Sequence, residues 1–254
     1  MRDKCLIDTH CHMDLTNDVD TIIMEADNNN VKRMIISGCD KKSIRDGLEI
    51  IYRYDEIFMT AGFHPDEADV VTDKDLEDLE NVIKTNKKII GVGEIGLDYY
   101  HNDDNRDKQI ELFEKQLKIA EKYDLPVVIH SRDSIQDIYD ILAKHKNRGV
   151  IHCFSGSLEM AREFVKLGFY LGIGGVITFK NSKLKDIFEE ITLDNIVLET
   201  DSPYLAPEPY RGHTNYPKNI KIVATELRKI KEVTLEEVTE KTTANVNKIY
   251  NLFK

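Results

Sequence analysis

Short runs of β-branched and other apolar residues alternate with longer amphipathic stretches along the chain. In one of these stretches Ile110, Phe113 and Leu117 recur every three or four residues, followed by Ala120, which places one apolar stripe of a helix against a sheet. Strands that alternate with such helices are typical of a parallel sheet with crossover helices. The pattern predicts eight strands, at residues 5–10, 33–37, 57–62, 89–94, 126–130, 149–152, 169–173 and 196–200.

Eight strand-helix units in 254 residues predict an α/β protein with the TIM (β/α)8 barrel fold. A doubly wound open sheet is the alternative, because periodicity does not distinguish a closed sheet from an open one. We expect an extra C-terminal helix, since Thr234 and Glu237 have the spacing of a capping box. The apolar face of that helix consists of Leu235, Val238, Thr242, Val246, Ile249 and Phe253. Neither a linker composition nor a long repeat divides the chain, so residues 1–254 are expected to form a single domain.

Composition narrows the choice of protein class. Hydrophobic residues make up 41% of the chain and charged residues 32%, as in an ordinary globular enzyme. The net charge of −11 excludes a nucleic-acid coat protein, unless bound cations supply a positive field locally. The longest uncharged apolar stretch, residues 167–179, is too short to cross a bilayer. With no apolar leader and no C-x-x-C pair among its four cysteines, the chain is expected to be cytoplasmic.

The first candidate for chemistry is a pair of histidines at the end of the first predicted strand. His10 and His12 point to one face of that strand and Cys11 to the other, because strand side chains alternate. Two imidazoles on one face can bind a metal ion, although a hydrogen-bonded surface pair has the same pattern.

Further residues of the kinds that bind metals stand at or just after the ends of other predicted strands. They are Glu94, His130, His152 and Asp201. The C-terminal ends of barrel strands meet at one rim, where the active sites of such barrels lie. Each has an ordinary alternative: a salt-bridge partner for Glu94, a carbonyl-bonded histidine for His130, a helix-end partner for His152 and an N-cap for Asp201. A metal site explains all of them together with His10 and His12, whereas unpaired buried charges would be costly.

Four imidazoles and two carboxylates exceed the needs of one tetrahedral ion, so we expect two divalent cations with a carboxylate between them. Glu94 is the candidate bridge. His10, His12 and Asp201 would complete one site, and His130 and His152 the other. Nitrogen and oxygen ligands suit Mg, Mn, Fe or Zn, and the sequence does not select among them.

Three residues next to these candidates have a supporting or structural interpretation. Asp8 and Glu199 each stand two residues before a candidate ligand, where they would orient imidazoles or, alternatively, pair with a lysine or arginine of the core. Cys153 follows His152 and is expected to be a buried thiol and not a ligand.

Several motifs, in this order, resemble those of the TatD family of metal-dependent deoxyribonucleases in the amidohydrolase superfamily. They are DTHCHMD (8–14), GEIGLDYY (93–100), IHSRD (129–133), HCFSG (152–156), GIGG (172–175), ETDSPYLAP (199–207) and TTANVNKIYNLF (242–253). The resemblance covers nearly the whole chain, and all six candidate ligands stand at matching positions. It implies a TIM barrel, two divalent metal ions and hydrolysis of DNA phosphodiester bonds, with 3′ to 5′ exonuclease action. Glu94 replaces the carbamylated lysine that is frequent in the superfamily, as is usual in this family.

The expected mechanism is an attack on phosphorus by a metal-activated water, with Asp201 and Glu94 as catalytic residues. Asp201 would accept or orient the proton of the water, and Glu94 would lie between the cations. No nucleophilic serine or cysteine is required. The cations would also supply the local positive field that the acidic chain lacks.

Three residues are candidates for substrate binding. His64, in the sequence GFHP, resembles the family's phosphate-side histidine. The proline-rich loop at residues 202–217 holds Tyr204, which can stack on a base, and Arg211, which can bind a phosphate. Alternatively, this loop is a stiff lid that packs its own tyrosines.

The glycines of the GIGG motif have two explanations. Gly172, Gly174 and Gly175 either let backbone amides approach a phosphate or allow tight packing near the seventh strand.

The substrate is therefore expected to be DNA, single-stranded or with frayed ends, and the residues indicate no membrane contact and no obligate protein partner. Two other functions fit the same residues. A hydrolase of ester or amide substrates, such as a deacylase, would share every ligand and differ only in its pocket. A binding module that holds its metal ions structurally would have closed coordination and no position for water.

Overall fold

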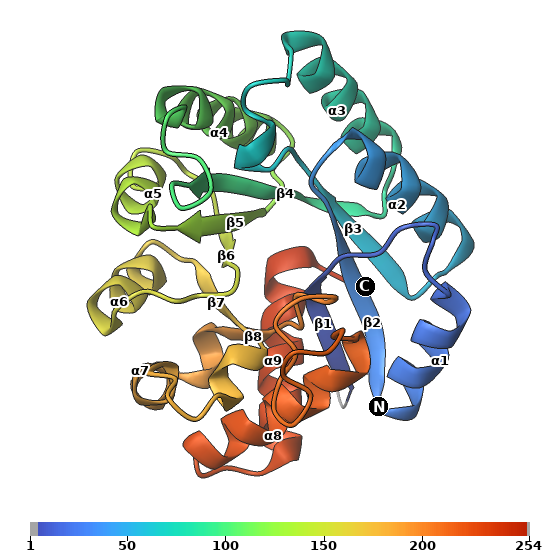
Figure 1. Ribbon diagram of the computed structural model, residues 1–254, viewed down its shortest axis with the longest axis vertical. Helices are drawn as coiled ribbons and strands as arrows, with labels where there is room; N and C mark the ends of the chain where they lie inside the picture. The colour runs from blue at the N-terminus through green and yellow to red at the C-terminus, as the bar shows by residue number, and fades with distance from the viewer. Residues whose placement is uncertain (1–4, 253–254) are drawn as a thin grey trace.

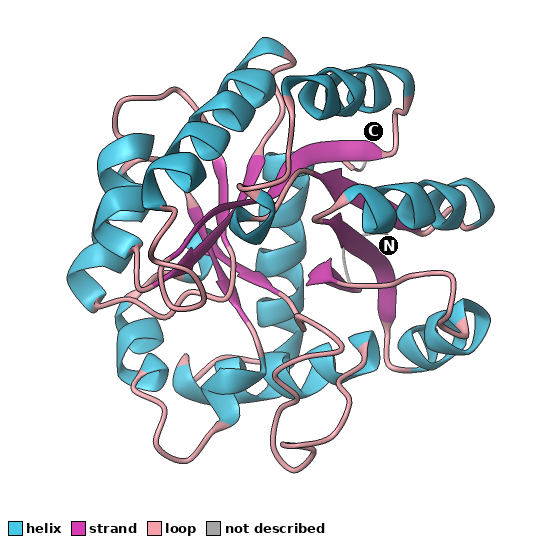
Figure 2. Ribbon diagram, turned by 45° about the horizontal axis from the view of Figure 1, so that its top comes forward, coloured by secondary structure: helices cyan, strands magenta, loops and turns pink. Residues whose placement is uncertain are grey.

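The computed structural model describes residues 5–252. Its eight parallel strands form one sheet and follow one another in chain order. Helices surround this sheet on the outside (Figures 1 and 2). The strands are β1 (Leu6–Cys11), β2 (Val31–Gly38), β3 (Ile57–Ala61), β4 (Ile89–Asp98), β5 (Val127–Arg132), β6 (Gly149–Ile151), β7 (Tyr170–Ile173) and β8 (Ile196–Leu198).

A helix follows each strand, and one more helix ends the described chain. The helices are α1 (Val19–Asn28), α2 (Lys41–Arg53), α3 (Asp73–Thr85), α4 (Arg106–Lys122), α5 (Ile135–Leu142), α6 (Leu158–Lys166), α7 (Leu184–Glu190), α8 (Ile220–Ile230) and α9 (Leu235–Tyr250). Four short 3-10 helices accompany them: η1 (Pro65–Glu67), η2 (Gly175–Thr178), η3 (Leu193–Asn195) and η4 (Pro217–Asn219). The predicted apolar stripe of α4 is confirmed, since Phe113, Leu117 and Ala120 are fully buried.

The sheet closes where the end of β1 meets the segment that follows β8. The amide of Asp201 donates to the carbonyl of His10 at 2.9 Å, and the amide of His12 donates to the carbonyl of Ser202 at 2.7 Å. The carboxylate of Asp8 reinforces this seam by accepting from the amide of Thr200 at 2.9 Å. The predicted barrel is therefore confirmed, and the open-sheet alternative is wrong.

Helix α9 covers the end of the barrel opposite the candidate ligands. Its residues Val246, Ile249 and Tyr250 pack in one apolar cluster with strand residues. The strand residues are Ile7, Ile35, Ile90, Val128, Val150 and Val197. The side chain of Thr234 accepts from the amide of Glu237 at 3.1 Å, so the predicted extra helix and its N-cap are confirmed. Phe253, predicted on the same apolar face, lies outside the described residues.

The predicted end of the fourth strand is wrong. Strand β4 does not end at Glu94 but continues to Asp98, where it pairs with Arg132 of β5. The pairing of β4 with β5 is irregular between Val92 and Ile95, and regular pairing resumes beyond it. Glu94 therefore lies inside its strand and within the barrel. Across residues 5–252 we find no helix long and apolar enough to span a membrane.

Candidate metal centre

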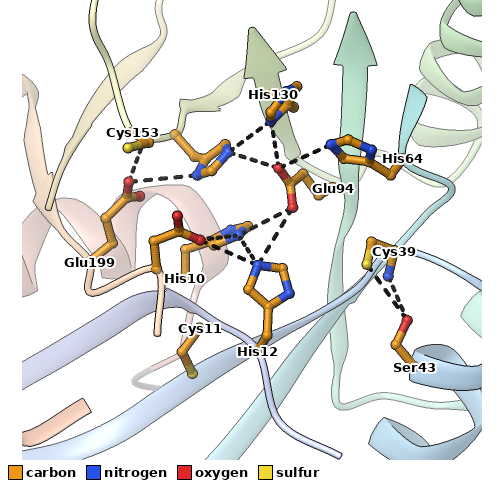
Figure 3. Close-up of polar contacts among 12 residues, drawn as sticks. His10, Cys11, His12, Cys39, Ser43, His64, Glu94, His130, Cys153 and Glu199 are labelled. Atoms are coloured by element: carbon orange, nitrogen blue, oxygen red, sulfur yellow. Dashed lines mark hydrogen bonds and ion pairs between the residues drawn. The ribbon is translucent and has the colours of Figure 1, made fainter. Parts of the chain in front are cut away.

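The six residues predicted as ligands converge at the C-terminal side of the barrel. Figure 3 labels His10, His12, Glu94 and His130 among them. His10 lies near the end of β1 and His12 just after it, Glu94 lies in β4 and His130 in β5. His152 follows β6, and Asp201 follows β8. Glu94, His10, His152 and Asp201 are buried. Strands far apart in the sequence thus place imidazoles and carboxylates in one polar cluster.

Each oxygen of the Glu94 carboxylate faces a different pair of histidines. Oε1 lies 2.8 Å from Nε2 of His152 and 2.9 Å from Nδ1 of His130. Oε2 lies 3.4 Å from Nε2 of His10 and 3.8 Å from Nε2 of His12. A carboxylate with this environment has the geometry to bridge two cations.

The pair formed by His10 and His12 is completed by Asp201. The two Nε2 atoms are 3.3 Å apart, and Oδ1 of Asp201 lies 3.3 Å from Nε2 of His12 and 3.8 Å from Nε2 of His10. At most one nitrogen of such a facing pair of neutral imidazoles can donate to the other, so a shared cation is a better partner for both.

Three groups of side chains have donor atoms within 4.8 Å of one another, as a metal ion requires. They are His10, His12 and Glu94; His10, His152 and Asp201; and His64, Glu94 and His130. Each group combines imidazole nitrogen with carboxylate oxygen, the donor set that suits zinc and other divalent cations. The residues present therefore fit a divalent metal ion.

Comparison with known proteins agrees with this geometry. The family described as TatD related DNase matches residues 7–251. The chain belongs to the TatD family of metal-dependent hydrolases. It is 37% identical to the uncharacterized metal-dependent hydrolase YabD of Bacillus subtilis, with 97% of this chain and 99% of the relative covered. It is 36% identical to the uncharacterized metal-dependent hydrolase MJ1582 of Methanocaldococcus jannaschii, with 98% of each chain covered.

Solved structures show the same family and fold. The TatD homologue YjjV of Escherichia coli superposes with a TM-score of 0.93 and 31% identity, over 99% of this chain and 100% of that chain. A TatD family hydrolase of Entamoeba histolytica has a TM-score of 0.87 at 23% identity, over 97% of this chain and 98% of that chain, which shows the shared fold.

The two carboxylates of this TatD-family site favour the ionised form. Burial would raise the pKa of Glu94, but the charge of His152 and hydrogen bonds from His10 and His130 hold it well below its usual value. Burial would likewise raise the pKa of Asp201, but the hydrogen bond with His12 and the neighbouring imidazoles lower it. Both groups thus carry the negative charge that attracts a cation.

The imidazoles divide into two kinds. Burial, together with the charge of His152, lowers the pKa of His10, so this ring is neutral and its nitrogen can act as a ligand. Burial would also lower the pKa of His152, but the charge of Glu94 raises it well above the usual value. Burial opposes protonation of His12 too, and its hydrogen bond to Asp201 raises the pKa well above the usual value. A cation that binds here must displace protons from His12 and His152.

Glu199 and Asp8 do not pair with a lysine or arginine among residues 5–252, so that alternative is wrong. Glu199 accepts from the amide of Cys153, and its Oε1 lies 3.7 Å from Nδ1 of His152. Asp8 accepts from the amide of His10 at 3.3 Å, and therefore orients the backbone of that residue and not its ring. Burial raises the pKa of Asp8 to about 8, against the lowering effect of its hydrogen bonds with Thr200.

Asp98 is a further member of the site that is not among the residues predicted from the sequence. Its Oδ2 lies 3.0 Å from Nε2 of His130 and 2.8 Å from Nδ1 of His101. His130 thus has a carboxylate at each ring nitrogen, because Glu94 faces its Nδ1. Glu94, Gly96 and Asp98 alternate along the chain, which places Asp98 on the same strand face as Glu94. This pattern could have identified Asp98 if the strand had not been predicted to end at Glu94.

His64 lies at the edge of the cluster. It caps η1 through Nδ1, its Nε2 is 3.9 Å from Oε1 of Glu94, and its ring centroid lies 4.4 Å from that of His130. The structure thus brings this predicted phosphate-side histidine next to the candidate ligands.

The two other predicted substrate residues differ in their distance from the cluster. The ring of Tyr204 lies 5.7 Å from that of His12 and is 60% exposed. The guanidinium of Arg211 lies 4.2 Å above the ring of Phe179 and contacts none of the candidate ligands. Tyr204, Tyr210 and Tyr216 are all exposed, so the loop does not pack its own tyrosines.

Two glycines of the GIGG motif, Gly172 in β7 and Gly175 just after it, serve close packing. A Cβ on Gly172 would lie 2.3 Å from Oε2 of Glu199, and one on Gly175 would lie 2.2 Å from the carbonyl oxygen of Leu205. The sulfur of Cys153 belongs to none of the three donor groups, and the residue is only partly buried.

Proposed function

We propose that this TatD-family hydrolase is a deoxyribonuclease that removes nucleotides from DNA in the 3′ to 5′ direction with two divalent metal ions (Mg, Mn or Zn). The observation that carries the proposal is the carboxylate of Glu94, whose oxygens face two separate groups of ligand atoms. His10, His12 and Asp201 would hold one ion, and His130 and His152 the other. The family description, TatD related DNase, supports DNA as the substrate.

When bound, the ions would lower the pKa of a water molecule and balance charge on the phosphate oxygens. The chain itself supplies the proton acceptor. Asp201 is ionised beside His12, and we assign it the role of orienting and accepting the proton of the attacking water. Glu94 would hold the two groups of ligands at a fixed position relative to each other.

The rim of the site suits a single strand or a frayed end. The exposed ring of Tyr204 beside His12 can stack on an unpaired base. His64, beside Glu94 and His130, would contact a phosphate oxygen, and Arg211 would contact the strand farther along the loop. In a chain of net charge −11, the ions themselves would attract the phosphate. We also propose that the enzyme works in the cytoplasm, since the spacing of its four cysteines, with no C-x-x-C pair, favours reduced thiols.

The test is hydrolysis of end-labelled single-stranded DNA by the purified protein with Mg or Mn, and with a chelator. We expect a ladder of products that shortens from the 3′ end and disappears with the chelator. Asp201→Asn should keep the fold and lose turnover by at least about a hundredfold, since a positioned general base contributes that much. Asp140→Asn, at an exposed position of α5, is the matched control and should cleave normally.

Other outcomes would change the assignment. Uncut DNA together with chelator-sensitive hydrolysis of ester or amide substrates would overturn the nuclease in favour of a deacylase-type hydrolase. A metal-loaded protein that is inert toward phosphodiesters, esters and amides would favour a binding module.

A further inference from the structure

An arginine and a tyrosine beside the metal centre form a stack that the proposed chemistry does not use. The guanidinium carbon of Arg132 lies 4.2 Å from the ring centroid of Tyr100. Tyr100 is 62% exposed, and Arg132 is exposed at the end of β5. The stack occupies one face of the guanidinium and leaves its N–H edge open to an acceptor.

Two connections link this stack to the candidate ligands. Arg132 stands two residues after His130 on β5, so both side chains project from the same face of the strand. Asp98 accepts from the amide of Tyr100 at 3.0 Å while its Oδ2 faces His130. The same buried carboxylate therefore orients a candidate ligand and the loop that carries Tyr100.

The stack lies beyond the candidate ligands along β5. Residues two apart on a strand are separated by about 6.6 Å, so Arg132 stands about that far past His130 along the strand. Strands β4 and β5 lie across the barrel from β1 and β8, where Tyr204 stands beside His12. The metal centre is thus flanked by one exposed aromatic ring on each side.

Arg132 differs from most of the described arginines because it has no carboxylate partner in the described part of the chain. Five described arginines lie within 4.0 Å of a carboxylate: Arg45, Arg53, Arg106, Arg148 and Arg162. Within residues 5–252, Arg132 forms neither an ion pair nor a hydrogen bond that would neutralise it. With 46 acidic residues in the chain, an exposed arginine without a carboxylate is available to an external anion.

We infer that Arg132 and Tyr100 form a nucleotide subsite next to the metal centre, in which Arg132 binds a backbone phosphate of the strand and Tyr100 stacks on its base. This inference rests on the proposed function, because it takes DNA as the substrate. It adds a subsite on the β5 side of the mouth, whereas Tyr204 and Arg211 belong to the loop after β8.

The test compares Arg132→Ala and Tyr100→Ala with wild-type protein on a long single strand and on a dinucleotide. The dinucleotide has a single phosphate, so with its phosphodiester bond at the metal centre it has no further phosphate for Arg132 to bind. We expect KM for the long strand to rise about tenfold in each variant, as for the loss of one stacked base or one charged phosphate contact. Hydrolysis of the dinucleotide should stay within about twofold of wild type.

Binding provides a second readout. In an Asp201→Asn background the labelled strand survives, and its anisotropy measures affinity at several salt concentrations. Arg132→Ala should reduce the slope of log affinity against log salt by about 0.7, the value for one phosphate contact with a single strand. Tyr100→Ala should weaken binding and leave that slope unchanged.

Arg228→Ala is the matched control. Arg228 lies in the last turn of α8, and like Arg132 it has no ion pair among the described residues. In a βα barrel this end of the helix lies away from the rim that carries the active site, so the variant should match wild type in every measurement.

Two results would overturn the inference, and they differ from each other. If wild type cleaves the long strand but Arg132→Ala and Arg228→Ala have the same KM and the same salt slope, the subsite is wrong and the nuclease stands. If wild type neither binds nor cleaves DNA, the proposed function fails and the subsite fails with it. Equal losses on the long strand and on the dinucleotide would also contradict a separate subsite, since they would indicate damage to the metal centre.

Discussion

At the scale of single residues, the site depends on carboxylates buried among imidazoles. An isolated carboxylate inside the barrel would be costly, and the histidines around Glu94 remove that cost. His130 shows how a neighbouring carboxylate sets the position of the proton on a candidate ligand. A neutral imidazole donates from only one nitrogen, so a cation at Nδ1 requires the proton on Nε2, where Asp98 accepts it.

Gly172 offers a test of how Glu199 is held. In Gly172→Ala the new Cβ would lie 2.3 Å from Oε2 of Glu199, so the carboxylate must move away from its place beside His152. We expect the affinity for Mn to fall about tenfold, as for the loss of other groups that orient a metal ligand. Calorimetric titration of the chelator-treated protein measures this change.

Gly174→Ala is the control for this substitution. Its Cβ would meet nothing closer than the carbonyl oxygen of Glu199 at 3.7 Å, an ordinary contact. Equal Mn affinity in the two variants would contradict an orienting role for Glu199.

At the scale of elements, helix starts coincide with side chains that satisfy free amides. Thr72 accepts from the amide of Asp75 at the start of α3, and the carboxylate of Asp75 in turn accepts from the amide of Thr72 at 2.9 Å. Asp40 and Ser43 repeat this reciprocal arrangement at the start of α2. Such boxes fix where the crossover helices begin.

Asp75 makes the stability of α3 dependent on pH. Its hydrogen bond with Lys41, together with those from Thr72, lowers the pKa of Asp75 from 3.8 to about 2. Because the folded-state pKa lies below the unfolded value, ionised Asp75 stabilises the fold above pH 3.8, and this contribution is lost as the pH falls toward 2. Asp75→Asn should therefore lower the urea midpoint at neutral pH, and its difference from wild type should shrink as the pH falls from about 4 to 2.

Asp73→Asn is the control on the same turn. The carboxylate of Asp73 is 85% exposed, and Lys115 is its one ion-pair partner within residues 5–252. A gap between wild type and Asp75→Asn that stays constant down to pH 2 would contradict the assignment to this carboxylate.

At the scale of the whole molecule, the metal centre joins strands from opposite sides of the barrel. His10 and Asp201 flank the closing seam, and His130 lies across from them on β5. An ion held by these residues binds the folded chain but not the unfolded chain, because only folding brings the ligands together. The centre is thus expected to stabilise the entire barrel.

Addition of Mn to chelator-treated protein should raise the thermal midpoint. At a concentration about a hundred times the dissociation constant, the stabilisation is about 2.7 kcal/mol. For a chain of this size that corresponds to a rise of roughly 5–10 °C, measured by scanning calorimetry. Glu94→Gln removes the charge between the two ligand groups and should show little rise relative to its own metal-free midpoint. The same rise in both proteins would indicate that Mn binds elsewhere.

Local sequence determined the elements and the side of the molecule on which chemistry occurs. A period of two or of three to four residues reports which face of an element is buried, so it identified the strands and the stripe of α4. The cap at Thr234 identified α9. Because parallel strands all end on the same side of a barrel, the positions of the six candidate ligands at strand ends predict that they meet at one rim. This prediction requires no distances.

Tertiary structure decided which of these residues face one another. The extension of β4 to Asp98 brings that carboxylate to His130, and the pairing of Asp98 with Arg132 sets the start of the loop that carries Tyr100. These relations depend on strand register and on how the barrel closes, which no local pattern encodes. The sequence by itself therefore identified the fold and the kinds of ligand. Only the closed barrel placed Glu94 between two groups of histidines, because that position depends on contacts among residues in or just after β1, β4, β5 and β6 at once.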